Sequence, residues 1–298
     1  MRCRSLRLVA LGLVLALAEK AVAADRRCSF IGLRRGEQAA CHGTERSVQG
    51  RTYCVQAPTK VQPHLPVVLV LHGFGSNGES QAHYFGLDDR VDPRGFLLVK
   101  PNGTRNSGGQ RYWNVSGPDD VSYLSAVLDD VLAAYGGDPR RLLVVGHSNG
   151  GFMAHRLACE RSERIAAIVS LAGAVYPALC HPSQPVSILD VRGTADPLVK
   201  YEGGTLLRLG PYVSAVTTVD FWARADGCQP AHRSQPSRGL LCSSSSDHPE
   251  TAVESYSGCP AGISVEQWRQ DGVGHIPNFA LPGWPDAVLD FLLAHPKP

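Results

Sequence analysis

The chain has 298 residues, of which 43% are hydrophobic and 19% are charged, and its formal net charge at pH 7 is +2. This length suits one large globular domain. The near-neutral balance, without a block of like charges, points to neither a nucleic-acid nor a membrane partner, and we expect a monomer.

The first 24 residues have the features of a secretory signal peptide. Three arginines in the first seven positions precede an apolar run from Leu8 to Ala18, and small residues at 21–24 suit cleavage. The run is shorter than the ~20 residues that a membrane-spanning helix needs, although an uncleaved anchor is an alternative. We expect a secreted protein, extracellular or periplasmic, with one domain at 25–298 that begins with a Cys-rich arm at 25–51.

Eight cysteines remain after the signal peptide, and an even number in an exported chain favours disulfides. They are Cys28, Cys41, Cys54, Cys159, Cys180, Cys228, Cys242 and Cys259. Loop lengths favour the pairs Cys159–Cys180 and Cys228–Cys259, and the pairing of the other four stays open. The chain has no CxxC pair and no zinc-type spacing, so we expect no metal site.

Short apolar runs alternate with helical patterns along the chain. The predicted strands are Val67–Leu71, Phe96–Lys100, Arg141–Val145, Ile165–Leu171, Val186–Arg192 and Ile263–Arg269. The predicted helices are Asp120–Tyr135, capped by Asp119 or Asp120, then Gly150–Glu160 and Ala287–Leu293. This order predicts an α/β fold with a mostly parallel sheet covered by helices on both faces. Residues 229–247 are rich in Ser, Pro and Arg, which predicts an irregular surface insertion.

Residues 146–150 read Gly-His-Ser-Asn-Gly and match the G-x-S-x-G pattern of a nucleophilic serine. The match follows a predicted strand and opens a predicted helix, which is the setting that this motif requires. We therefore expect Ser148 to be the nucleophile. His147 should point away from the Ser148 hydroxyl, because the turn is sharp.

Acyl transfer also needs two N–H donors for the developing oxyanion. The backbone N–H of Asn149, directly after the serine, is the first candidate. The loop His72-Gly73-Phe74-Gly75 follows the strand that ends at Leu71, and we expect the N–H of Phe74 to be the second.

A serine nucleophile needs a base and an orienting acid, which in hydrolases of this type follow in the order Ser, Asp or Glu, His. Asp196 lies directly after the strand ending at Arg192, and His275 lies in a Gly-rich loop after the strand ending at Arg269. We expect these two residues to complete a catalytic triad. The less suitable candidates are Asp190, Asp220, Asp226 and Asp247 for the acid, and His147, His181, His248 and His295 for the base.

Several segments together resemble the polyhydroxybutyrate depolymerase-like and feruloyl esterase-like family of secreted carbohydrate esterases. They are LHGFGSNG (71–78), PNGT (101–104), WN (113–114), DDVSYL (119–124), GHSNGGFMAHRLAC (146–159), RGTADPLV (192–199) and GVGH (272–275). The resemblance implies an α/β-hydrolase fold and cleavage of carboxylic esters without a cofactor. It also implies the disulfide Cys159–Cys180 and a structural turn at Asp119-Asp120.

The chain departs from this family after the proposed base, where many members carry Trp and this sequence has Ile276. We expect His72, Trp113 and Ile276 to line the substrate site. The predicted substrate is a polyester oligomer or a feruloyl or acetyl ester of a polysaccharide. A peptidase of the same fold and a non-catalytic binding protein are the alternatives.

Overall fold

The computed structural model describes residues 40–60, 62–117, 120–207, 209–238, 251–277 and 283–297. The predicted signal peptide, the arm before residue 40, Cys28, Cys242 and Asp119 lie outside these residues.

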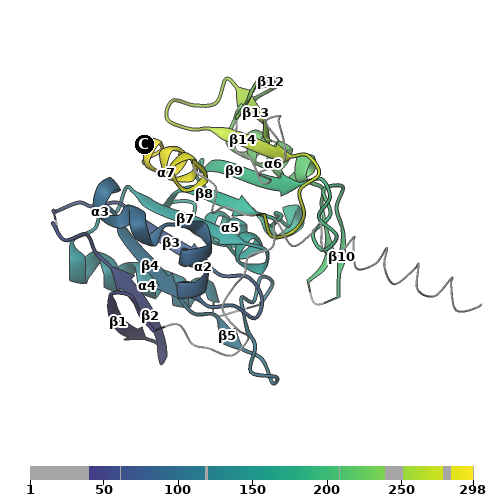
Figure 1. Cartoon of the computed structure of the whole chain (residues 1–298). Helices are drawn as coiled ribbons and strands as arrows, with labels where there is room; N and C mark the ends of the chain where they lie inside the picture. The colour runs from purple at the N-terminus through teal and green to yellow at the C-terminus, as the bar shows by residue number, and fades with distance from the viewer. Residues whose placement is uncertain are drawn as a thin grey trace, which may run out of the picture.

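Within the described residues, ten strands form one sheet in the order β1-β2-β4-β3-β7-β8-β9-β14-β13-β12 (Figure 1). Their bounds are β1 Thr44–Val48, β2 Arg51–Gln56, β3 Val67–Leu71, β4 Leu97–Pro101, β7 Leu142–His147, β8 Ile165–Leu171, β9 Ser187–Gly193, β12 Gln229–Arg238, β13 Thr251–Ser257 and β14 Val265–Gln270. The six central strands, β4, β3, β7, β8, β9 and β14, run parallel to one another. The strands on either side of them pair antiparallel to their neighbours. Two small hairpins pair β5 (Thr104–Arg105) with β6 (Arg111–Tyr112), and β10 (Gly204–Leu206) with β11 (Gly210–Tyr212).

The core follows from the apolar runs of the sequence. Every residue of β3, β4, β7, β8 and β9 is buried, because helices cover both faces of these parallel strands. The predicted strands agree with the observed ones to within one or two residues at each end. The predicted mostly parallel α/β architecture is confirmed.

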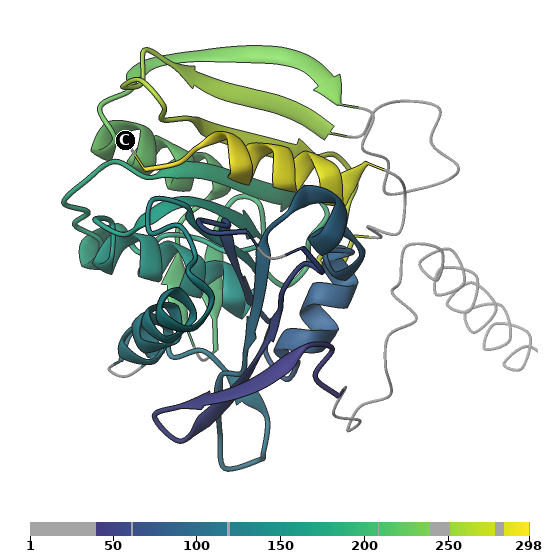
Figure 2. The ribbon, with the colours of Figure 1, turned by 90° about the vertical axis from the view of Figure 1, so that its left-hand side faces the viewer.

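The helices form a layer on each face of the sheet. They are α2 Gly78–Phe85, α3 Val91–Arg94, α4 Asp120–Tyr135, α5 Asn149–Glu160, α6 Ala215–Ala225 and α7 Trp284–Ala294, with short 3-10 turns at η1 Asp88–Arg90 and η2 Pro177–Leu179. α4 and α5 contact each other, and Trp222 of α6 donates to His155 of α5. Arg90 and Arg94 form ion pairs with Asp286 of α7 on the other face, where Figure 2 shows α7 in yellow near the blue helices. No helix among the described residues is long and apolar enough to cross a membrane.

Two segments expected to be irregular contain edge strands. The arm before residue 51 includes β1, which pairs with β2, and the predicted surface insertion begins with β12, which pairs with β13. An antiparallel edge strand can face water on one side and needs no continuous apolar run. β1 is mostly exposed or half-buried, and β12 reads QPAHRSQPSR, so neither produces the signal of a buried strand.

Three disulfides are present in the described residues. Cys159–Cys180 and Cys228–Cys259 are the two pairs favoured from the sequence, and Cys41–Cys54 is a third pair that the sequence left open. Disulfides of this kind are typical of proteins that mature in an oxidising compartment.

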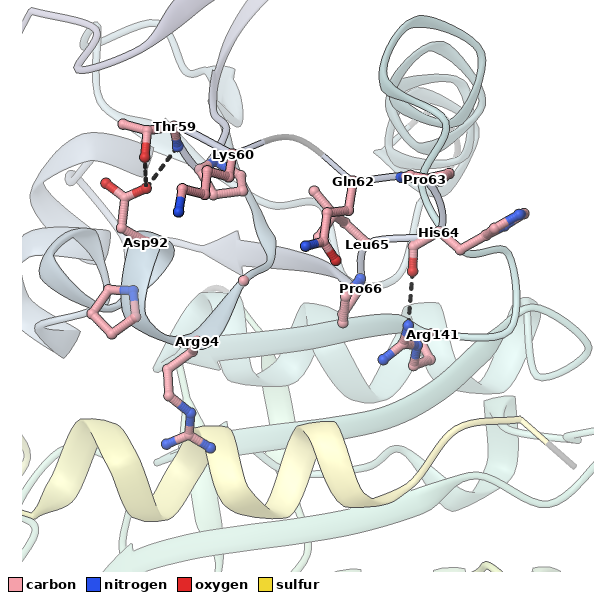
Figure 3. Close-up of a pocket in the computed structure, with 13 residues that line it drawn as sticks. Thr59, Lys60, Gln62, Pro63, His64, Leu65, Pro66, Asp92, Arg94 and Arg141 are labelled. Carbon is pink, nitrogen blue, oxygen red and sulfur yellow. Dashed lines mark hydrogen bonds between the residues drawn. The ribbon is translucent and has the colours of Figure 1, made fainter.

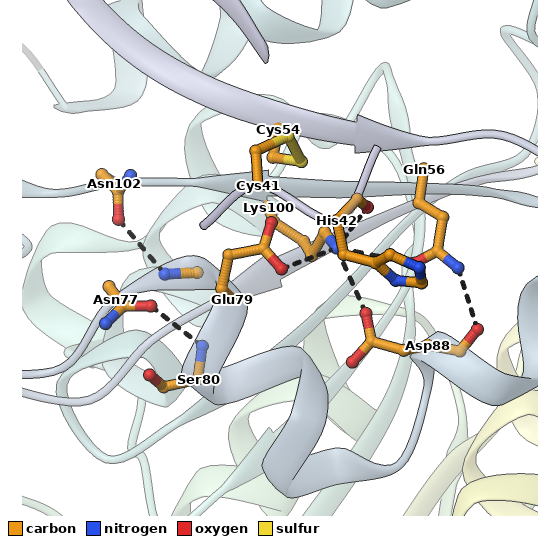
Figure 4. Close-up of polar contacts among 11 residues, drawn as sticks. Cys41, His42, Cys54, Gln56, Asn77, Glu79, Ser80, Asp88, Lys100 and Asn102 are labelled. Atoms are coloured by element: carbon orange, nitrogen blue, oxygen red, sulfur yellow. Dashed lines mark hydrogen bonds and ion pairs between the residues drawn. A yellow bond between two sulfur atoms is a disulfide. The ribbon is translucent and has the colours of Figure 1, made fainter. Parts of the chain in front are cut away.

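A buried lysine ties the end of the arm to α2 and β4 (Figure 4). The Lys100 side chain has no exposed surface, and its Nζ lies 2.9 Å from Glu79 Oε2 and 3.1 Å from Asp88 Oδ1. Nζ also donates to the carbonyl oxygen of His42, which directly follows the disulfide-bonded Cys41. Removing one partner from a buried ion pair costs about 3–5 kcal/mol, so loss of either carboxylate should destabilise this junction between the arm, α2 and β4.

Candidate active site

The residues expected to carry chemistry meet at the carboxyl ends of the parallel strands. Ser148 follows β7, Asp196 follows β9 and His275 follows β14. At the opposite end, before β3, β4 and β7 begin, a hollow of about 680 Å³ is lined by prolines, basic residues and other polar residues such as Asp92 (Figure 3). The residues expected to be catalytic do not line this hollow, and ligands of open parallel sheets bind at the carboxyl ends instead.

Ser148 occupies a strained turn between β7 and α5. Its φ of 55° and ψ of −120° lie outside the regions that residues other than glycine usually adopt. The turn requires close backbone packing, since a Cβ at Gly146 would overlap the Gly150 carbonyl and a Cβ at Gly150 would overlap the Leu71 carbonyl. Because glycine has no Cβ, the backbone at 146 and 150 can pack closely in this turn, which places Ser148 at the start of α5.

Three side chains form a continuous hydrogen-bonded row. His275 Nε2 lies 3.0 Å from Ser148 Oγ, and His275 Nδ1 lies 2.7 Å from Asp196 Oδ2. The second carboxylate oxygen of Asp196 accepts hydrogen bonds from the N–H groups of Leu198 and Val199, at 2.8 and 2.9 Å. The Asp196 side chain is 1% exposed and the His275 side chain 11%, so this row is largely shielded from water.

The loops that carry Asp196 and His275 are joined to each other by their backbones. β9 and β14 are parallel neighbours in the sheet. The N–H of Ala195 donates to the carbonyl of Val273, and the N–H of Gly272 donates to the Thr194 hydroxyl. These bonds hold Asp196 Oδ2 and His275 Nδ1 at 2.7 Å, although the two residues are 79 positions apart in the sequence.

Asp190, an alternative acid, lies in the core and not at this edge. Its carboxylate has no exposed surface and contacts His155 at 3.6 Å and Arg192 at 3.4 Å. It lies inside β9, six residues before Asp196, so its position matches a structural role.

The loop after β3 lies beside the serine, since a Cβ on Gly73 would come 3.6 Å from the Cβ of Ser148. The N–H of Gly73 donates to Gln81 of α2, the carbonyl of Gly73 accepts from the N–H of Ser76, and Phe74 is 42% exposed. Asn149 is the first residue of α5, and a helix leaves the N–H groups of its first turn unbonded.

Two of the three residues expected to line the substrate site are placed elsewhere. Trp113 and His72 have no exposed surface, so neither can touch a substrate in this conformation. Trp113 is held through its indole N–H, which donates to the His72 carbonyl, and through its backbone, which bonds to the Asn149 side chain in both directions. Its expected role in the substrate wall is therefore corrected to a role in packing behind the site. Ile276 is 49% exposed directly after His275.

His72 is also fixed by its hydrogen bonds. Its Nε2 accepts from the N–H of Gly103, so its Nδ1 carries the proton and donates to the Gly73 carbonyl. Burial lowers the pKa of His72 to about 4, and the ring is neutral near pH 7. This buried ring supports the loop at Phe74 instead of contacting a substrate.

The comparisons with known proteins identify the family to which this fold belongs. The α/β hydrolase fold family model matches residues 66–234. NocK of Nocardia uniformis subsp. tsuyamanensis, a protein named as an esterase, is 30% identical over 263 residues, which cover 76% of this chain and 74% of NocK. Feruloyl esterase C of Emericella nidulans is 27% identical over 269 residues, covering 87% of this chain and 90% of that protein.

A solved structure has the same fold. The acetyl xylan esterase from Aspergillus awamori superposes with a TM-score of 0.60 at 14% sequence identity, covering 85% of this chain and all of the other. The chain belongs to the α/β hydrolase fold family.

Proposed function

We propose that this chain is a carboxylic ester hydrolase in which Ser148 is the nucleophile, His275 the general base and Asp196 the orienting acid. The observation that carries the proposal is the continuous row from Ser148 Oγ through the His275 imidazole to Asp196 Oδ2, with distances of 3.0 and 2.7 Å. The relatives named as esterases support an ester as the substrate.

The reaction follows from the positions of these groups. Ser148 Oγ attacks the ester carbonyl while His275 Nε2 takes the hydroxyl proton, and the carbonyl electron pair moves onto the oxygen. The backbone N–H groups of Phe74 and Asn149 donate to that oxyanion. As the tetrahedral intermediate collapses, the C–O bond to the alcohol breaks and His275 returns the proton to it. Water then attacks the acyl-enzyme carbonyl while His275 takes its proton. The bond from the acyl carbon to Ser148 Oγ breaks, the proton returns to Ser148, and the acid leaves.

No cofactor takes part in this scheme. Asp196 holds the Nδ1 proton of His275, so that Nε2 faces Ser148 as an acceptor, and it stabilises the imidazolium when the proton moves. Losing one oxyanion donor typically costs about 3 kcal/mol of transition-state stabilisation.

The proposed substrate is a feruloyl ester of a polysaccharide. Feruloyl esterase C of Emericella nidulans aligns with this chain over 90% of its own length, and Phe74 and Ile276 place exposed apolar side chains in the loops around Ser148. Acetyl groups on xylan are the second candidate, because a bifunctional acetylxylan esterase/xylanase of Neocallimastix patriciarum is 24% identical, although this chain spans only 32% of it.

The test is hydrolysis of a chromogenic short-chain ester by the wild type and by Ser148→Ala. Turnover should fall by several orders of magnitude in the variant, and near-wild-type turnover would refute the proposal. Acid release from methyl ferulate, acetylated xylan and hydroxybutyrate oligomers then ranks the substrates. Faster acetate than ferulate release would exclude the feruloyl assignment, and cleavage of a peptide amide but no ester would indicate a peptidase.

The mature protein is proposed to be a secreted monomer whose single catalytic domain spans 25–298, after removal of a signal peptide at 1–24. The three disulfides support export into an oxidising compartment. N-terminal sequencing of the exported protein and its mass in solution test these two points.

A further inference from the structure

The ring of His147, directly before Ser148, faces the backbone of the loop that carries His275. His147 Nε2 lies 2.9 Å from the carbonyl oxygen of His275. The ring centroids of the two histidines are 5.0 Å apart, and Tyr84 packs on His147 at 5.5 Å. His147 thus lies between α2 and the loop that carries His275, residues 272–277, which is called the base loop below.

The hydrogen bond to this carbonyl fixes the protonation of His147. A carbonyl oxygen can only accept, so Nε2 must carry a proton and donate it. Burial, followed by the nearby His275, lowers the pKa of His147 to about 3. The ring is therefore a neutral donor at neutral pH, and it adds no positive charge beside His275 when that residue takes the proton of the serine.

Tyr84 of α2 makes a second bond of the same kind two residues further along. Its side chain is almost fully buried, and its hydroxyl donates to the carbonyl of Pro277 at 2.8 Å. The segment from His275 to Pro277 has no regular secondary structure. Two buried side-chain donors therefore hold the carbonyls at both of its ends.

The rest of the base loop is held differently. The residues before His275 are bonded through Val273 and Gly272 to the loop that carries Asp196, and these bonds act on only one side of His275. This loop contains Gly272 with a φ of 73°, as well as Gly274, so its backbone has wide conformational freedom. A restraint on the far side of His275 narrows the range of positions that this backbone can take, and with it the distance from the imidazole to Ser148.

We propose that His147 is a positioning residue, which holds the His275 backbone so that the imidazole reaches Ser148, and that Tyr84 assists through the Pro277 carbonyl. The inference rests on the proposed function, since it concerns the same nucleophile and base. It assigns a task to the variable position before the serine in the G-x-S-x-G pattern of this chain.

The test compares variants that differ in whether they keep an N–H donor. His147→Leu should lower kcat for a p-nitrophenyl ester about 10- to 100-fold with KM within about threefold, because misplacing a reacting group by 1 Å costs about 100-fold in rate. Labelling of Ser148 by diethyl p-nitrophenyl phosphate should slow by the same factor. His147→Gln, whose amide can donate to the same carbonyl, should recover most of both rates. Tyr84→Phe should lower kcat by a smaller factor, about threefold to tenfold.

His295→Leu is the matched control, because His295 also contacts a backbone carbonyl through a ring nitrogen, but on α7 at Phe291. It should leave kcat unchanged. If His147→Leu does not fold, His147→Asn, whose amide is too short to reach the carbonyl, replaces it in the comparison with Gln.

The results separate this inference from the proposed function. An inactive Ser148→Ala together with wild-type kcat in His147→Leu would overturn the positioning role alone. The same holds if His147→Gln is as impaired as His147→Leu, because the donor would then not be what matters. Full activity of Ser148→Ala would overturn the proposed function itself.

Discussion

Replacing Asp196 with asparagine should disable the base while leaving the fold intact. Asp196 uses one oxygen for the N–H groups of Leu198 and Val199 and the other for His275 Nδ1. Asparagine has a single oxygen, which stays with the two backbone donors because that keeps two hydrogen bonds instead of one. Its NH₂ group then faces Nδ1, so the imidazole proton moves to Nε2, and His275 can no longer accept the proton of Ser148.

A wrong imidazole tautomer of this kind costs about 10⁴-fold in kcat, or about 5 kcal/mol of transition-state stabilisation. The assay is steady-state hydrolysis of a p-nitrophenyl ester, with thermal unfolding to check that the variant is folded. Asp271→Asn is the matched control, because Asp271 lies four residues before His275 with an exposed side chain and should keep wild-type kcat. A kcat of Asp196→Asn within tenfold of wild type would refute the assignment of Asp196 as the orienting acid.

Three further predictions concern stability. Burial raises the pKa of Asp226 to about 7, so its carboxyl ionises more easily in the unfolded chain than in the folded one. Stability therefore falls as the pH rises from about 4 to 7, by about 4 kcal/mol in all, and stays at that lower level at pH 8. Asp226→Asn should therefore gain stability relative to wild type on going from pH 4 to pH 8 in urea unfolding, and an equal difference at both pH values would contradict this. Gly150→Ala should unfold at a clearly lower temperature and lose turnover, because the new Cβ overlaps the Leu71 carbonyl, and a wild-type melting temperature would argue against that close approach. Replacing both Cys159 and Cys180 with serine opens a loop with a sequence separation of 21 and should cost about 3 kcal/mol, whereas a loss below about 1 kcal/mol would show that the bond constrains little.

The central sheet and the order of the three proposed catalytic residues could be predicted from the sequence because both depend on local patterns. Buried parallel strands are continuous apolar runs, and their carboxyl ends meet at one edge, so Ser148, Asp196 and His275 are brought together by the topology alone. The glycines on either side of Ser148 likewise predicted the tight, strained turn at this residue.

What could not be predicted depends on contacts between segments far apart in the chain. Trp113 has the same appearance in sequence whether it lines a cleft or packs beneath it, and only its bond to the His72 carbonyl decides. The ring of His147 donates to the carbonyl of His275, which lies 128 residues further along the chain. The Cys41–Cys54 pair depends on a hairpin whose exposed strand β1 carries no apolar pattern.

The β10–β11 hairpin stands apart from the ten-stranded sheet and directly follows the segment that carries Asp196. Its base is held by the Tyr212 hydroxyl, which accepts from the N–H of Lys200, while Leu207 at its turn is fully exposed. Tyr212 is also largely buried and packs against Phe152 of α5 with ring centroids 5.8 Å apart, so the base of the hairpin is part of the core. For engineering, changes of sequence or length therefore belong at the exposed position Leu207, because replacing Tyr212 would remove the hydrogen bond to the segment that follows Asp196.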